Sequence, residues 1–173
     1  MAILKIRTYP DPVLTRPAEL VREITPEVTA LIDDMAETMY FNDGLGLAAP
    51  QVGISKRIFV MDVPVDEERS SNLRVLINPE ITAREGWFVM EEGCLSFPEL
   101  TVEIQRAANV TVEALERDGR KIVVEAEGLD AVCLQHEIDH LDGLVLVDRL
   151  GPLMRRFALK EFARLQRTAG GEE

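Results

Sequence analysis

The two histidines of this chain lie four positions apart, at His136 and His140, with Glu137 beside the first of them. Residues at this spacing share one face of an α-helix, so two imidazoles can hold one cation between them. Glu137 projects toward the edge of that face, near a bound metal without being a ligand, which is where a general base belongs. The motif therefore predicts a metal-binding helix that carries a hydrolytic base.

A pair of packed, hydrogen-bonded core histidines would have the same spacing, so the motif has a purely structural alternative. The chain uses its only two histidines here, and a thiol lies upstream of them. These two observations favour metal binding over a core pair.

The residues around the motif indicate which element must position it. One apolar stripe, Leu129, Val132 and Cys133, leads into His136 and His140. A second stripe, Leu134, Ile138 and Leu141, lies on the opposite side of the helix. Gly143 is a typical helix stop. Because a helix that is apolar on both sides is buried, we expect residues 129–143 to run through the middle of the fold.

The remaining elements predict an α+β fold. Thr25-Pro26-Glu27 has the cap, proline and acid of a helix start, and an amphipathic C-terminal helix is expected after Gly151-Pro152. A short strand at 3–9 is expected to lead into an irregular arm. Further strands are expected at 58–63, 75–77, 101–104, 110–115, 122–125 and 145–147, with a hairpin turn at 118–119 and a polar loop at 66–72. This order does not alternate as βαβ units do. We therefore expect mostly antiparallel sheets packed around the central helix, with N-terminal and C-terminal helices.

Length and charge limit the classes of protein to consider. The 173 residues suit one domain, which we place at 1–168, followed by a disordered tail at 169–173. A net charge of −12 argues against a general nucleic-acid or anionic-membrane binder. The chain has no apolar run that would span a bilayer, no secretory signal, and too few cysteines for a disulfide framework. We expect a cytoplasmic monomer with no membrane partner and no sequence-specific nucleic-acid partner.

The segment from Arg149 to Arg167 is basic, unlike the chain as a whole. It has two interpretations. It could be an ordinary solvated helix face, or it could dock on the ribosome, whose RNA would attract it.

Two histidines leave a catalytic site incomplete, because such a site needs three protein ligands and an open position. Cys133 lies one turn before His136, where its side chain leans away from a metal held by the histidines. Cys94 is free of that constraint and follows Gly93, which lets the backbone approach a site. Two alternatives stay open: a closed structural zinc site made by both cysteines with His136 and His140, and a metallopeptidase.

A stretch of small residues, Gly44 to Gly53, allows close approach of the backbone to a ligand or to another strand. It lacks the third glycine of a dinucleotide fingerprint. A tight packed loop would look the same, and Gln51 could then be a solvated residue rather than an amide donor in a site.

Three blocks of this chain together resemble the peptide deformylase family. They are Gly44-x-Gly46-x-Ala48-Ala49-x-Gln51, Glu92-Gly93-Cys94-Leu95-Ser96 and Gln135-His136-Glu137-x-Asp139-His140-Leu141-x-Gly143. They occur in the family's order and span nearly 100 residues, which makes the match far more specific than the histidine motif alone.

The resemblance implies hydrolysis of the N-formyl group from the formyl-methionine of newly made polypeptides, with release of formate. It implies one divalent metal, most often Fe²⁺ with Zn²⁺, Ni²⁺ or Co²⁺ as substitutes, held by Cys94, His136 and His140. On this resemblance, water would complete the coordination and attack the formyl carbon, and Glu137 would act as general base and then acid. The Gln51 amide and the Leu95 backbone N–H would hold the oxyanion.

The resemblance also implies where a formyl-methionyl peptide binds. The segment Gly44-Leu45-Gly46 would pair with the substrate backbone as an added strand. The other substrate-binding residues implied are Met90, Glu92, Gly93, Leu129, Val132 and Cys133. Among these, Leu45, Met90, Leu129, Val132 and Cys133 would line the pocket for the methionine side chain.

Overall fold

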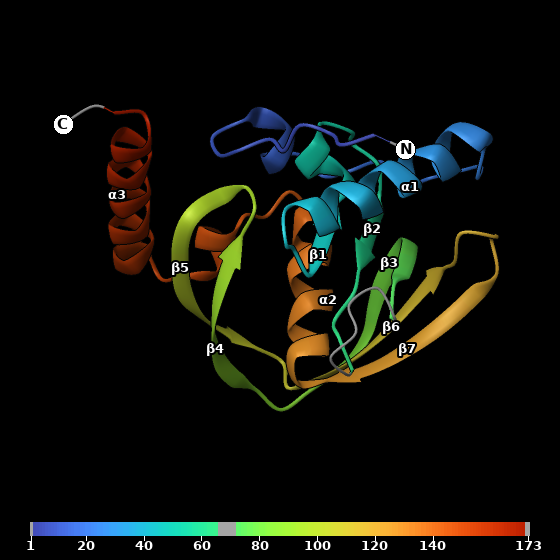
Figure 1. Cartoon of the computed structure of the whole chain (residues 1–173). Helices are drawn as coiled ribbons and strands as arrows, with labels where there is room; N and C mark the ends of the chain where they lie inside the picture. The colour runs from blue at the N-terminus through green and yellow to red at the C-terminus, as the bar shows by residue number, and fades with distance from the viewer. Residues whose placement is uncertain (1, 66–71, 172–173) are drawn as a thin grey trace.

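The computed structural model describes residues 2–65 and 72–171, and these form two antiparallel sheets with a helix between them (Figure 1). The helices are α1 (Pro26–Phe41), α2 (Gly128–Leu141) and α3 (Pro152–Ala169). The strands are β1 (Gly46–Ala48), β2 (Ile58–Met61), β3 (Arg74–Glu85), β4 (Phe88–Cys94), β5 (Phe97–Arg106), β6 (Asn109–Leu115) and β7 (Lys121–Glu127). The expected α+β architecture is confirmed.

The larger sheet has the order β1-β2-β3-β6-β7, and β4 pairs with β5 in a separate two-stranded sheet. All pairings between these strands are antiparallel. In Figure 1, α2 lies between the two sheets, α1 crosses one end of the larger sheet, and α3 lies beyond β5. The central helix can therefore meet side chains from both sheets.

Helix α2 is buried along most of its length, as its two apolar stripes predict. Its residues Leu134, Ile138 and Leu141 pack into one core cluster with Phe59 and Met61 of β2. The helix ends at Leu141, and Gly143 follows with a φ of 76°. A Cβ atom there would lie 2.7 Å from the backbone of Arg16, so only glycine fits both the turn and the contact.

Helix α1 starts where the sequence predicts. The Thr25 hydroxyl accepts a hydrogen bond from the Val28 N–H at 3.3 Å, and Pro26 takes the first helical position. The predicted hairpin turn between β6 and β7 is also confirmed, with Gly119 at a φ of 86°.

Two predicted strands are wrong. Residues 3–9 are an extended arm outside both sheets, held by bonds such as Arg7 N–H to the Gln51 carbonyl at 2.7 Å. Residues 145–147 enter a 3₁₀ turn, Leu146–Arg149, because the Asp148 carboxylate accepts from the Val145 N–H at 2.9 Å and closes the turn.

The strand expected at 75–77 is longer than predicted, because β3 continues through Asn78-Pro79 to Glu85. The register against β6 shifts between Ile77 and Glu80, and this irregularity accommodates a proline inside a strand. Asn78, at a φ of 50°, uses its side-chain amide to pair with the Val21 backbone N–H and carbonyl at 2.9 and 2.8 Å.

Two further predicted segments, the polar loop and the C-terminal tail, lie partly outside the described residues. Residues 66–71 of the expected polar loop lie outside them, as do residues 172–173 of the expected tail. Helix α3 includes Ala169, the first residue that we assigned to the tail. Among residues 2–65 and 72–171, no helix has the length and apolar character needed to cross a membrane.

Candidate metal centre

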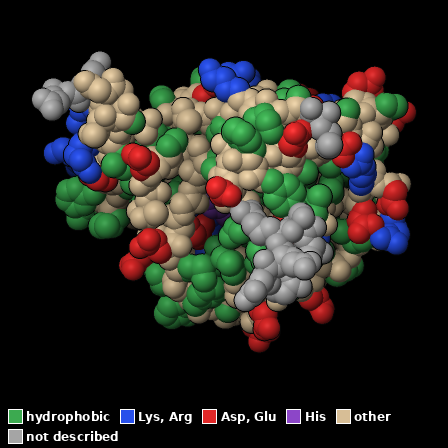
Figure 2. Space-filling model, in the orientation of Figure 1, with side chains coloured by type: hydrophobic (Ala, Val, Ile, Leu, Met, Phe, Trp, Pro, Cys, Tyr) green, Lys and Arg blue, Asp and Glu red, His purple; other side chains and the backbone are tan. Residues whose placement is uncertain are grey.

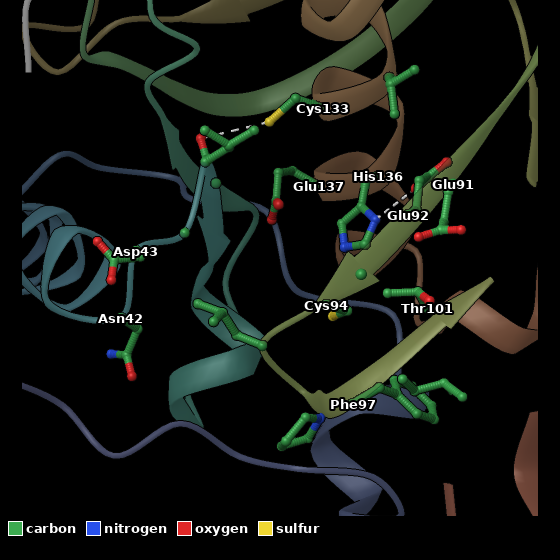
Figure 3. Close-up of a pocket in the computed structure, with 18 of the residues that line it drawn as sticks. Asn42, Asp43, Glu91, Glu92, Cys94, Phe97, Thr101, Cys133, His136 and Glu137 are labelled. Carbon is green, nitrogen blue, oxygen red and sulfur yellow. Dashed lines mark hydrogen bonds and ion pairs between the residues drawn. The ribbon is translucent and has the colours of Figure 1, made fainter. Parts of the chain in front are cut away.

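The end of β4 and one face of α2 bring three potential metal ligands together (Figure 3). The Cys94 thiol, the His136 imidazole and the His140 imidazole each offer one atom, and these atoms all lie within 4.8 Å of one another. Cys94 Sγ is 3.4 Å from His140 Nε2, which is 3.2 Å from His136 Nε2. The two histidines are neighbours because they are one helical turn apart, as the motif predicts.

These separations fit a shared cation. Tetrahedral bonds to sulfur and nitrogen at the usual lengths place the ligand atoms about 3.5 Å apart. His136 Nδ1 lies 3.0 Å from Glu92 Oε1, so the ring donates there and its Nε2 lone pair faces the group. A set of one thiolate and two imidazoles suits Zn²⁺, Fe²⁺, Co²⁺ or Ni²⁺ better than Mg²⁺ or Ca²⁺.

The electrostatics of the group favour a thiolate at Cys94. Burial opposes ionisation of this thiol, but the charge of His140 and the hydrogen bond with His136 outweigh it and hold the pKa of Cys94 well below its ordinary value. Burial also opposes ionisation of Glu92, yet hydrogen bonds from His136 and Arg106 lower the pKa of that carboxyl. Both the candidate ligand Cys94 and Glu92, the hydrogen-bond partner of His136, are thus stabilised as anions.

Cys133 does not join the ligand group. Its Sγ donates to the Leu45 carbonyl at 3.7 Å, on the side of α2 that faces β1. Burial raises the pKa of this thiol well above its ordinary value, so it stays protonated. The side-chain direction predicted for Cys133 is confirmed, and the geometry gives no support to a closed site with four ligands.

Glu137 is a buried carboxylate beside the group. Burial raises its pKa above the ordinary value, although His136 and His140 act in the opposite direction. Within the described part of the chain, Glu137 Oε2 has no hydrogen-bond partner. A Cβ atom on Gly46 would lie 2.5 Å from Glu137 Oε1, so the carboxylate occupies space that only glycine in β1 leaves open.

Gln51 is buried in the short 3₁₀ turn Ala49–Val52 and is held in one orientation. Its Oε1 accepts from the Ala48 N–H at 3.0 Å, which fixes the amide group. Its Nε2 therefore points at Ser96 Oγ and Cys94 Sγ, at 3.2 and 3.6 Å. The sequence allowed two interpretations of Gln51. The solvated loop residue is wrong because Gln51 is buried, and its amide points into the site instead.

A cavity of about 580 Å³ opens beside these residues. Figure 2 shows its mouth as a hollow with histidine at its base. The residues that the resemblance implied as substrate contacts all line it: Gly44, Leu45, Gly46, Met90, Glu92, Gly93, Leu129, Val132 and Cys133. Glu137, Gln51, Leu95, Cys94 and His136 line it as well.

Several residues that line or support this cavity were not predicted from the sequence. Asn42, Asp43, Glu91, Phe97 and Thr101 also border it. Arg106 is a further addition, because it holds both oxygens of Glu92 at 2.8 and 2.9 Å. A single arginine in a strand gives no sequence signal for this contact, since its partner lies 14 residues away across a strand pair.

Together, an α+β fold and an H-E-x-x-H helix whose two histidines meet a cysteine from β4 are the features of a metal-dependent hydrolase. The model of the polypeptide deformylase family matches residues 3–156 of this chain. The chain belongs to the polypeptide deformylase family, whose members are enzymes.

Individual relatives agree with this assignment. The chain is 52% identical over 162 residues to a peptide deformylase of Thermodesulfovibrio yellowstonii, covering 94% of this chain and 98% of the relative. It is 42% identical to a solved peptide deformylase of Legionella pneumophila, with a TM-score of 0.91 and coverage of 99% and 100%. A peptide deformylase of Ehrlichia chaffeensis solved in complex with actinonin is 40% identical, with a TM-score of 0.89 and coverage of 96% and 99%.

Proposed function

We propose that this enzyme removes the N-formyl group from the formyl-methionine of newly made polypeptides and releases formate, using one divalent metal ion. The observation that carries the proposal is the convergence of the Cys94, His136 and His140 ligand atoms beside the buried Glu137 carboxylate. Membership of the polypeptide deformylase family supports the choice of reaction. We place the activity in one domain, residues 1–168.

We assign Fe²⁺ as the working metal, with Ni²⁺, Co²⁺ and Zn²⁺ as substitutes. A bound divalent ion would lower the pKa of a water ligand and polarise the formyl oxygen. The thiolate and the two imidazoles match the preference of these ions for sulfur and nitrogen ligands.

Glu137 moves the proton in this proposal. Burial raises the pKa of Glu137 toward neutral pH. This suits a group that must accept a proton from water and then give it to the departing amine. Its unpartnered oxygen leaves room for that exchange. No other described carboxylate that lines the cavity combines this burial with a free oxygen.

Two donors would hold the oxyanion that forms on the formyl carbon. Gln51 Nε2 is aimed at Cys94 and is held there by the bond between its Oε1 and Ala48. The Leu95 backbone N–H follows directly after Cys94, at the cavity wall. Fixed donors of this kind stabilise developing negative charge without reorganisation.

The substrate chain would lie against β1. This strand is at one edge of the larger sheet, so the Gly44–Gly46 segment can pair with an extended peptide. The methionine side chain would enter the apolar part of the cavity, formed by Leu45, Met90, Leu129, Val132 and Cys133. The Ehrlichia chaffeensis relative was solved with actinonin, and we propose that the same compound binds this cavity and blocks the reaction.

Formate release tests the proposal. We expect anaerobically prepared protein loaded with Fe²⁺ or Ni²⁺ to release formate from a formyl-Met tripeptide, and actinonin to stop it. Cys94→Ser should lose metal and activity together, whereas Cys133→Ser should keep one metal per chain because its thiol faces Leu45. Absence of formate from metal-loaded protein would contradict the reaction, and loss of metal in Cys133→Ser would favour the closed zinc site.

Docking on the ribosome through α3 is a separate proposal, as are the monomeric state and the cytoplasmic location. The basic residues Arg156, Lys160, Arg164 and Arg167 on α3 are all exposed, and Figure 2 shows basic and apolar side chains gathered at this end of the molecule. Changing Arg156, Lys160 and Arg167 to glutamate should abolish co-sedimentation with ribosomes at moderate salt. Unchanged sedimentation would contradict docking through this helix.

A further inference from the structure

A chain of alternating charges runs from the His136 imidazole to the surface near the start of α3. Glu92 contacts His136 Nδ1 at 3.0 Å and accepts two hydrogen bonds from Arg106, at 2.8 and 2.9 Å. Arg106 Nη1 donates to Asp139 at 2.6 Å. Arg149 closes the series by donating to both oxygens of Asp139. We call these four residues, Glu92, Arg106, Asp139 and Arg149, the charge chain.

Burial makes the balance of charge in this chain important. The side chains of Arg106 and Glu92 are 3% and 5% exposed, and that of Asp139 is 10% exposed. These three alone would leave one uncompensated negative charge in the interior. Arg149, at 41% exposure, supplies the balancing charge from the surface. Removing one partner of a buried ion pair leaves a charge that its neighbours must compensate.

One oxygen connects the inner and outer halves of the charge chain. Asp139 Oδ2 accepts from Arg106 Nη1 at 2.6 Å and from Arg149 Nε at 2.9 Å. Without Arg149, the whole charge of Asp139 would act on Arg106 and draw it away from Glu92. Glu92 would then hold the His136 ring less firmly, because Arg106 fixes both of its oxygens.

We propose that Arg149 is a positioning residue for the metal centre, acting through Asp139, Arg106 and Glu92 on the orientation of His136. This inference rests on the proposed function, since it assumes that His136 binds metal. Hydrogen-bond partners of a ligating histidine typically change metal affinity about 10- to 100-fold. Arg149 is three links beyond that first partner, so we expect the affinity to fall about 3- to 10-fold when it is replaced.

Co²⁺ binding tests the inference without relying on activity. Arg149→Gln should bind Co²⁺ more weakly in competition with a chelator, and the absorption bands of the bound Co²⁺ should shift because one imidazole is reoriented. Arg155→Gln is the matched control. Arg155 pairs with Asp148 at 3.3 Å and is 40% exposed, close to the value for Arg149, but neither residue contacts the charge chain in the hydrogen bonds described.

A double-mutant cycle separates this role from simple stabilisation. In an Asp139→Asn background, Arg149→Gln should have little further effect on Co²⁺ affinity, because the link that transmits it is already neutral. Equal Co²⁺ affinity and spectra for Arg149→Gln and Arg155→Gln would overturn the inference. So would a loss of metal-free stability in Arg149→Gln with Co²⁺ binding unchanged. If wild-type protein failed to bind one Co²⁺ per chain, the proposed metal site itself would be wrong.

Discussion

Helices α2 and α3 have similar lengths but differ in burial. Ten of the 14 residues of α2 are buried, whereas only two of the 18 residues of α3, Ala158 and Phe162, are buried. Some polar side chains of α2 have partners outside the helix, as Gln135 does with both backbone groups of Ala107 at 3.0 Å.

On α3 the ion pair of Arg164 and Glu161 stays within the helix and is exposed. Because α2 is buried on most sides, its side chains are held in place by their neighbours. Helix α3 packs through few residues, so most of its side chains are exposed to solvent. Matched substitutions in and around the two helices should therefore have very different effects.

Replacing the acid on each helix gives the largest expected contrast. Glu137→Gln should lower kcat/KM for formate release about 1,000-fold, because the proton carrier is lost while the ligands remain. Glu161→Gln on α3 should leave it unchanged. Steady-state kinetics with Ni²⁺-loaded protein measures both, with metal content as the control. Activity within tenfold of wild type in Glu137→Gln would remove this residue as the base.

Replacing a glycine near each helix tests packing rather than charge. Gly46→Ala should lower activity about 100-fold, because its Cβ would displace the Glu137 carboxylate that proton transfer requires. Gly151→Ala, before α3, should have little effect, since no atom of the described residues other than its chain neighbours lies within 4 Å of the added Cβ. The same formate assay compares the two variants. Full activity in Gly46→Ala would show that the carboxylate tolerates displacement.

Truncating one apolar side chain on each helix should lower the free energy of unfolding far more in α2 than in α3. Leu134→Ala in α2 removes a fully buried side chain and should cost about 2–5 kcal/mol. Phe157→Ala in α3, at 56% exposure, should cost less than about 1 kcal/mol. Urea unfolding of the metal-free proteins gives both values. A similar loss for the two variants would mean that α3 is as firmly integrated as α2.

The smallest expected difference between the two helices is in the effect of low pH on the free energy of unfolding. Burial opposes ionisation of Asp139, but Arg149 and Arg106 outweigh it and lower the pKa of this carboxyl. A lowered folded-state pKa gives stability that is present above the unfolded pKa of about 4 and lost as pH falls through the folded pKa.

We therefore expect Asp139→Asn to flatten the fall in unfolding free energy of the metal-free protein as pH is lowered below about 4. Glu161→Gln on exposed α3 should leave that fall unchanged. An acid limb in Asp139→Asn as steep as that of wild type would show that other carboxylates dominate it.

Relationships within one helix were predictable from the sequence. The spacing of His136 and His140, the burial of both sides of α2 and the cap at Thr25 all follow from 3.6-residue periodicity and local hydrogen bonding. The direction of Cys133 followed from the same geometry, because helix side chains lean toward the N-terminus. The three motif blocks further indicated the polypeptide deformylase family, whose model matches residues 3–156.

Contacts between distant segments were decided only by the tertiary structure. Residues 3–9 have the alternation of a strand, yet they pair with no strand in the described part of the chain. Residues 145–147 turn because the Asp148 carboxylate accepts a hydrogen bond from the Val145 N–H. The partners of Arg106 lie 14 and 33 residues away in the chain. Periodicity describes which face a side chain takes within its own element. Which groups then meet depends on how β4, β5 and α2 pack, and that packing puts the charge chain behind His136.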